Sequence, residues 1–129
     1  MKTPENLEYS MSHEWLDTKT GKVGITDNAQ EQLGDMVFVE FPEVGSEFGK
    51  DERFGSVESV KAVSDCYMPV GGKIVAINEE LLEAPEVINQ DPYGKGWLVQ
   101  IKVTDPLEID ELMNYKDYLQ FVKEEAGEH

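Results

Sequence analysis

The chain has 129 residues, of which 27 are acidic and 11 are basic, and its formal net charge at pH 7 is −16. Its length and its 40% content of hydrophobic residues predict one globular domain, residues 1–129, with a small core. So strong a negative charge argues against nucleic acid and anionic membranes as partners, and it serves either solubility or docking against basic surfaces of other proteins.

The first predicted elements are a lead-in and a hairpin. Residues 1–8, like residues 124–129, are expected to be loosely ordered. The start of the chain is polar, and no stretch approaches the roughly 20 apolar residues of a membrane span, so we expect a cytoplasmic protein, or a mitochondrial one if the source is eukaryotic. Residues 9–16 and 23–25 flank a turn at residues 19–22 and predict a β-hairpin.

A short helix and a strand follow. Asp27 and Gln30 have the spacing of a capping box, with Asp27 as N-cap, and Gly34 stands where a C-cap glycine would, which predicts a helix over residues 28–33. Residues 36–41 are rich in β-branched and aromatic side chains and predict a strand that Pro42 ends.

The centre of the chain predicts a second hairpin. Residues 53–60 and 63–70 indicate strands, with Val60, Lys61 and Ala62 at a tight tip between them. Gly71 and Gly72 predict the next turn, and residues 73–77 the next strand.

The last third predicts a helical turn, a loop, a strand and two helices. The helical turn is expected at residues 79–82, the loop at residues 89–96 and the strand at residues 97–103. The first helix is predicted by Asp105 as N-cap, Pro106 at its first position and Glu108 as the capping-box acid, and the final helix begins at about Asn114. Short strands and regular turns favour a mainly β sandwich or flattened barrel with short helices at its margins and a C-terminal helix pair.

Catalytic machinery is sparse. The histidines are His13 and His129, and Cys66 is the one cysteine, which excludes an internal disulfide and makes a zinc site of Cys and His ligands improbable. No phosphate-binding glycine motif is present. A carrier or binding role is therefore favoured over an enzyme.

Lys61 is singled out by its position and not by its type. It lies at a predicted turn tip beside the small Ala62, where its amine would be open to a modifying enzyme. Acylation of such an amine removes its charge and lengthens a flexible stem.

Several ordered segments resemble one family. Residues 55–62 (GSVESVKA) resemble the lipoylation motif of the glycine cleavage H-protein family, and the likeness extends in order from about residue 9 to residue 118. The other matching segments are residues 12–15 (SHEW), 23–26 (VGIT), 29–30 (AQ), 33–35 (LGD), 41–45 (FPEVG), Pro69, Gly72, Asn89, 91–93 (DPY) and 96–97 (GW). Biotinyl domains carry methionines beside their lysine, whereas Val60 and Ala62 stand here.

The resemblance implies a barrel-sandwich hybrid fold of the lipoyl/biotinyl type, with lipoate joined to Lys61 by an amide. It also implies that Glu58 and Gly72 are read by the lipoyl-attaching enzyme, a lipoate ligase or octanoyltransferase. Without such recognition, Glu58 would be a solvated carboxylate on a strand and Gly72 a glycine in a turn.

The resemblance further implies a shuttle of the glycine cleavage system. The partners would be glycine decarboxylase, which leaves an aminomethyl group on the arm, aminomethyltransferase, which passes the one-carbon unit on, and dihydrolipoyl dehydrogenase, which reoxidises the dithiol. The alternative is an H-like lipoyl carrier or relay for another complex, in 2-oxoacid dehydrogenase lipoylation or sulfur oxidation.

Three more residues match family positions near a cleft that shelters the loaded arm: Ser12, Glu14 and Asp65. Without a role in the cleft, Ser12 and Glu14 would be polar residues at a strand end and Asp65 an aspartate in a turn. Gln32 stands where some members carry histidine, which would alter that pocket.

Overall fold

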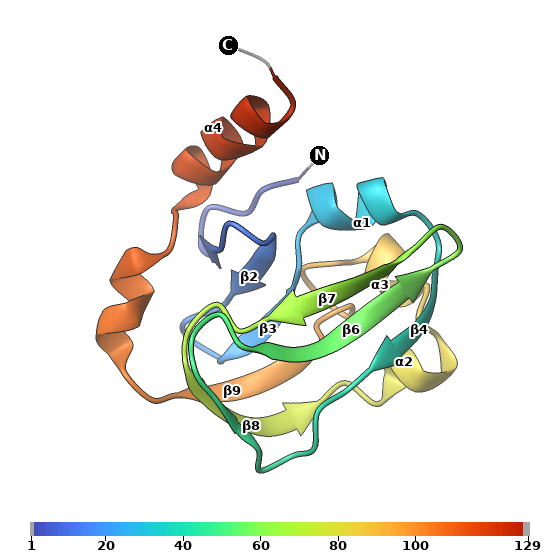
Figure 1. The fold of residues 1–129 in the computed structure, drawn as a ribbon, viewed down its shortest axis with the longest axis horizontal. Helices are drawn as coiled ribbons and strands as arrows, with labels where there is room; N and C mark the ends of the chain where they lie inside the picture. The colour runs from blue at the N-terminus through green and yellow to red at the C-terminus, as the bar shows by residue number, and fades with distance from the viewer. Residues whose placement is uncertain (1, 128–129) are drawn as a thin grey trace.

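The computed structural model describes residues 2–127 and shows two stacked β-sheets with helices at their margins (Figure 1). One sheet has six strands in the order β1-β2-β3-β9-β8-β5, and the other has three in the order β4-β6-β7. The sheets do not close into a barrel, and every strand pairing is antiparallel. The mainly β class with short helices is thereby confirmed.

The strands are β1 (Glu8–Tyr9), β2 (Glu14–Leu16), β3 (Lys22–Ile25), β4 (Met36–Glu40), β5 (Glu47–Phe48), β6 (Arg53–Ser59), β7 (Val63–Tyr67), β8 (Gly72–Ile77) and β9 (Val99–Val103). The helices are α1 (Asp27–Leu33), α2 (Glu80–Glu83), α3 (Val87–Gln90), the 3₁₀ helix η1 (Pro106–Glu111) and α4 (Tyr115–Glu125).

The core lies between the two sheets. Alternation along the strands turns Val39 and Val57 inward from the three-stranded sheet, where they meet Ile74 and Val99 of the six-stranded sheet, and all four are fully or almost fully buried. A second apolar cluster forms where α4 packs on β1 and β2, around Trp15, Tyr9 and Tyr118. Burial of these faces fixes the register of the hairpins.

The lead-in is not loose where the structure describes it. Leu7 and Tyr9 are buried, Tyr9 pairs with Trp15 in β1, and the Tyr9 hydroxyl donates to the carbonyl of Pro4. Apolar burial against α4 therefore orders a segment whose polar start suggested mobility. At the other end, α4 continues through Glu125, and the expected loose ordering of residues 128–129 lies outside the described residues.

Several local expectations are corrected. Thr26 is the N-cap of α1 in place of Asp27, because its hydroxyl accepts from the amide of Ala29. Glu108 does not close a capping box; its carboxylate accepts from the amide of Gly71, and the predicted helix there is a 3₁₀ helix. The structure also contains α3, which overlaps the first two residues of the predicted loop, and β7 ends at Tyr67 in place of residue 70. Within residues 2–127, no helix is long and apolar enough to cross a membrane.

Candidate functional site

The turn between β6 and β7 presents Lys61 at its tip. The amide of Ser59 donates to the carbonyl of Ala62 at 2.8 Å, and the Ser59 hydroxyl accepts from the amides of Lys61 and Ala62, both at 3.1 Å. One serine side chain therefore satisfies the backbone of the tight turn. The Lys61 side chain is exposed, as the sequence predicted.

The tip rests against the corner that ends α1. The amide of Val60 donates to the carbonyl of Asp35 at 3.0 Å. The Lys61 stem lies over Gly34, whose φ is +83°, and a Cβ at that glycine would come within 3.4 Å of Lys61 Cε. Figure 1 shows the β6–β7 turn beside the end of α1. A glycine at this corner thus serves both the helix end and the space for the lysine stem.

Asn89 at the end of α3 fastens the same corner. Its Oδ1 accepts from the amide of Met36 at 2.9 Å, and its Nδ2 donates to the carbonyl of Gly34 and to Gln30 Oε1, both at 2.9 Å. Sequence analysis gave Asn89 no role at the site. In the sequence, Asn89 is a polar residue beside a turn-rich stretch, and this position does not reveal that its partner, Gly34, lies 55 residues away.

Glu58 lies beside the tip and Gly72 does not. Glu58 is exposed on the outer face of the three-stranded sheet, opposite Phe38 on one side and Val63 on the other. Gly72 is buried at the start of β8, at the far end of the β6–β7 pair from Lys61 (Figure 1). A Cβ there would meet the carbonyl oxygen of Lys102 at 2.8 Å, so this glycine permits close strand approach and is not in the turn.

Glu14 is a buried carboxylate surrounded by donors. It is 1% exposed and accepts from the hydroxyl of Ser10 at 2.7 Å, from the hydroxyl of Ser12, and from the amide of Tyr67 at 3.2 Å. Burial raises the pKa of Glu14 to about 7, against the opposing effect of these hydrogen bonds. The structure therefore brings Ser12 and Glu14 together in one hydrogen-bonded cluster.

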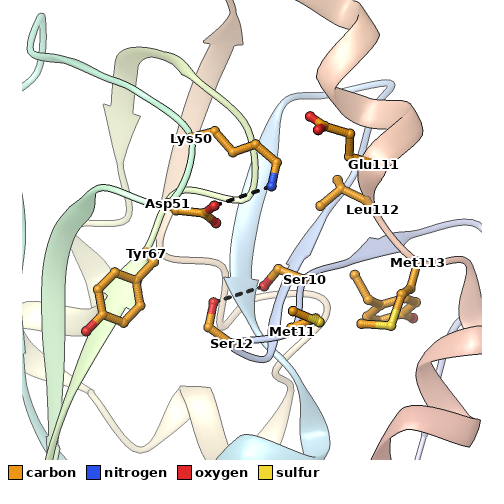
Figure 2. Close-up of a pocket in the computed structure, with 10 residues that line it drawn as sticks. Ser10, Met11, Ser12, Lys50, Asp51, Tyr67, Glu111, Leu112 and Met113 are labelled. Carbon is orange, nitrogen blue, oxygen red and sulfur yellow. Dashed lines mark hydrogen bonds and ion pairs between the residues drawn. The ribbon is translucent and has the colours of Figure 1, made fainter.

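A cleft of about 480 Å³ opens beside this cluster, and Figure 2 shows its lining. Ser10 and Ser12 face it from the β1–β2 connection, with Tyr67 from β7 and Lys50 and Asp51 from the loop before β6. The remaining lining residues are Tyr9, Met11, Glu111, Leu112 and Met113. The lining mixes polar groups of Ser10, Ser12 and Glu111 with apolar side chains such as Leu112 and Met113, which suits a ligand with a polar end and an apolar stem.

Neither Glu14 nor Asp65 is part of this lining: Glu14 is buried behind Ser10 and Ser12, which bind it, and Asp65 lies elsewhere. The Asp65 side chain is on the outer face of β7, where its Oδ1 accepts from Arg53 Nε at 2.8 Å. The same guanidinium pairs with Glu40, 3.2 Å away. Asp65 and Glu14 are thus separated by the strand itself, which sequence spacing could not show.

The other candidate groups are engaged elsewhere. His13 Nδ1 lies 2.7 Å from the hydroxyl of Tyr118 and Nε2 lies 2.8 Å from Glu125, so His13 docks α4. Burial raises the pKa of the Cys66 thiol, which excludes a ready thiolate. Gln32 lines a separate cavity of about 340 Å³ with His13 and not the cleft beside Glu14. Across residues 2–127, no cluster of three or more His, Cys, Asp or Glu side chains could hold a metal ion.

Comparison with known proteins gives one consistent family. Residues 7–125 match the family described as Glycine cleavage H-protein. The chain is 54% identical to the glycine cleavage system H protein of Halothermothrix orenii, over 96% of this chain and 98% of that protein. It is 50% identical to the protein of the same name from Carboxydothermus hydrogenoformans, with coverages of 95% and 96%.

A solved structure agrees with these sequence matches. The crystal structure of a glycine cleavage system H protein from Mycobacterium marinum superposes with a TM-score of 0.83 at 40% identity, covering 91% of this chain and 96% of that chain.

Proposed function

This chain belongs to the glycine cleavage H-protein family, and on that premise we propose that it is the lipoyl-bearing shuttle of the glycine cleavage system, with lipoate joined to Nζ of Lys61. A carrier role, and not catalysis of its own, follows from this assignment. The observation that supports the proposal is that Lys61 is exposed at the tip of a turn whose backbone is held by hydrogen bonds to Ser59 and Asp35.

Lys61 fits the attachment of such a group. Its side chain is exposed, and within residues 2–127 it forms no ion pair that acylation of the amine would break. The serine-capped turn and the Val60–Asp35 hydrogen bond hold the backbone still while the stem remains free. A rigid base under a flexible stem lets one amine enter the active sites of several enzymes.

Lys61 would hold the lipoyl group, which when bound would supply a dithiolane for carrying a one-carbon aminomethyl unit and electrons between glycine decarboxylase, aminomethyltransferase and dihydrolipoyl dehydrogenase. The chain itself supplies tethering, which raises effective concentration at each partner. Folate, PLP and FAD chemistry belongs to those partners.

The Glu14 cleft is proposed to shelter the loaded end of the arm. Tyr67, whose amide binds Glu14, is four residues beyond Val63 in β7, or about 13 Å along the strand. Lys61 itself stands two residues before Val63, and a fully extended lipoyl-lysine side chain spans about 14 Å from its Cα by ordinary bond lengths, so the arm can extend along β7 toward the cleft. Glu14 and Ser12 then offer oxygen acceptors to a small ammonium group.

Glu58 is proposed as a contact for the lipoate ligase or octanoyltransferase that modifies Lys61. It is exposed, three residues before the lysine and on the adjoining strand end. Gly72 is proposed to act on this recognition through the packing of β8 and β9, since its buried position leaves no surface beside Lys61. We propose a cytoplasmic location, which the bacterial source of the relatives supports.

Intact mass tests the attachment. Protein isolated from lipoate-replete cells is expected to carry the added mass of one lipoyl group, Lys61→Arg to lack it, and Lys73→Arg, a matched exposed lysine, to retain it. Purified glycine decarboxylase should then release carbon dioxide from glycine with the lipoylated wild type and with Lys73→Arg, and not with Lys61→Arg. Lipoylation without this turnover would favour a carrier for another complex, and labelled Lys61→Arg would refute the site.

A further inference from the structure

The connection between β1 and β2 carries both serines that bind Glu14. Ser10 donates to Glu14 Oε1 at 2.7 Å, Ser12 donates to the same oxygen, and the two hydroxyls lie 3.3 Å apart (Figure 2). The backbone amide of Glu14 also donates to the Ser10 hydroxyl, at 3.1 Å. The hydrogen bonds that the Glu14 carboxylate receives from hydroxyls therefore depend on the path of residues 10–13.

His13 ends this connection in a conformation that is unfavourable for its own backbone. Its φ is +70°, in the left-handed region that residues other than glycine seldom adopt. Its amide donates to the carbonyl of Ser10 at 3.2 Å, and its carbonyl accepts from the amide of Thr26 at 3.0 Å. A backbone in this region persists only where the surrounding contacts fix it.

The side-chain contacts that fix His13 come from α4. Its Nδ1 lies 2.7 Å from the Tyr118 hydroxyl, and its Nε2 lies 2.8 Å from Glu125 Oε1. Both ring nitrogens are engaged by one helix, so the imidazole cannot turn without breaking a contact with α4.

Tyr118 also contacts the other end of the connection. It is fully buried, and its ring stacks on that of Tyr9 with the centroids 4.7 Å apart. Tyr9 directly precedes Ser10, and His13 directly follows Ser12. One side chain of α4 therefore contacts residues on both sides of the segment that carries the two serines.

We propose that His13 is a positioning residue for Ser12 and Glu14, and that α4 sets the hydrogen bonds behind the cleft through His13. The cleft itself is lined by residues of other elements, so α4 acts on it through this contact. The consequence for the loaded arm rests on the proposed function, since it requires Lys61 to carry the arm.

The direction of the expected effect follows from the hydrogen bonds at Glu14. Those from Ser10 and Ser12 favour the ionised carboxylate and lower its pKa, against the burial that raises it to about 7. Release of His13 from α4 should weaken these bonds and raise the pKa of Glu14 further. Loss of a negative charge on α4, by contrast, can only favour ionisation and lower that pKa. The sign of the change thus separates lost positioning from lost charge.

The test follows the titration of the Glu14 carboxyl group by carbon NMR in the unlipoylated full-length protein. Glu125→Ala removes the partner of His13 Nε2 at a side chain that is 45% exposed, so the fold is retained. Tyr118→Phe removes the partner of Nδ1 without a change of charge and keeps the ring that stacks on Tyr9. Both variants are expected to raise the titration midpoint of Glu14 by roughly half a pH unit. Glu124→Ala is the matched control, because it removes the same charge from the neighbouring exposed position, and its midpoint should not rise.

The outcomes are distinct. A rise in both variants and not in the control supports the positioning role. A midpoint at or below the wild-type value in either folded variant, or an equal rise in Glu124→Ala, overturns it.

A second measurement separates this inference from the proposed function. With lipoylated, aminomethyl-loaded protein, Glu125→Ala and Tyr118→Phe should shorten the half-life of the loaded form several-fold, and Glu124→Ala should not. A raised midpoint with unchanged half-lives supports the positioning of Glu14 and overturns the sheltering of the arm. A wild type without the lipoyl mass overturns the proposed function, and the titration still decides the role of His13.

Discussion

The amide of Val60 donates to the carbonyl of Asp35 at 3.0 Å, and this hydrogen bond ties the lysine-bearing turn to the corner between α1 and β4. The corner is in turn fixed by Asn89, which bonds the backbone on both sides of Asp35. The position of Lys61 therefore depends on a residue near the end of a short helix and far away in sequence.

Asn89→Ala is expected to weaken both folding and lipoylation. Loss of its hydrogen bonds leaves the Met36 amide and the Gly34 carbonyl without partners, which lowers the free energy of unfolding by about 1–3 kcal/mol. The displaced tip should also lower kcat/KM for lipoyl attachment and speed amide hydrogen exchange at Val60. Urea unfolding, labelling rates and exchange measure the three effects.

Asn78→Ala is the control for Asn89. Asn78 is buried and its side chain donates to the carbonyls of Lys95 and Trp97, so it serves a different segment. It should destabilise the fold comparably and leave the labelling rate of the folded protein unchanged. Equal labelling of folded Asn89→Ala and wild type would show that the corner does not position the tip.

Glu14 should make the fold less stable as pH rises. Burial raises its pKa from 4.5 to about 7, so the native state holds a proton that the unfolded state releases. The resulting stability is fully present below about pH 4.5 and is lost as pH rises through about 7. Relative to Glu14→Gln, the wild type should lose up to roughly 3 kcal/mol of unfolding free energy across this range.

Denaturant titrations at several pH values measure this difference. Glu47→Gln, at an exposed carboxylate, is the control and should follow the wild-type pH dependence. Identical pH profiles for wild type and Glu14→Gln would contradict a raised pKa at this residue.

The loaded arm should be protected by Glu14 and less so by Asp65. Above about pH 7, where Glu14 is ionised, Glu14→Gln removes a negative charge behind Ser10 and Ser12 that would attract an ammonium group into the cleft, so the half-life of the aminomethyl-loaded form should shorten several-fold. Asp65→Asn should have the smaller effect, because that carboxylate is paired with Arg53 on the outer face. Timed release of formaldehyde from each loaded variant makes the comparison, and equal half-lives for wild type and Glu14→Gln would remove Glu14 from the cleft's function.

Glu58→Ala and Gly72→Ala should fail in different ways. Glu58 is exposed, so its replacement should slow lipoylation without a measurable change in Tm. Gly72→Ala places a Cβ 2.8 Å from the Lys102 carbonyl, and the forced strand shift should cost about 1–3 kcal/mol of stability. Measurements of Tm and of the lipoylation rate for both variants test these expectations. A Gly72→Ala variant with wild-type Tm would show that β8 and β9 can move apart without loss of stability.

Local chemistry in the sequence was enough to predict the lysine hairpin. Alternation in residues 53–60 separates Val57 from Glu58, and the small residues around Lys61 indicate a tight turn, since both signals act over a few residues. The same reasoning found the C-cap at Gly34, and it began the last helix at about Asn114, which is the N-cap of α4 in the structure. It misplaced the α1 N-cap by one residue because Thr26 and Asp27 are both good caps, and the hairpin that precedes the helix decided between them.

The surroundings of Lys61 were decided only by the tertiary structure. Glu14 meets the amide of Tyr67 across 53 residues, and Asn89 meets Gly34 across 55. Such partners are chosen by how the two sheets and α3 pack, and nothing in the local sequence encodes their distance. The sequence by itself therefore predicted an exposed hairpin tip at Lys61 through short-range turn and strand preferences, and the family resemblance singled out this lysine. Packing of distant segments determined what holds the tip and placed Glu14 in a buried cluster with Ser10 and Ser12.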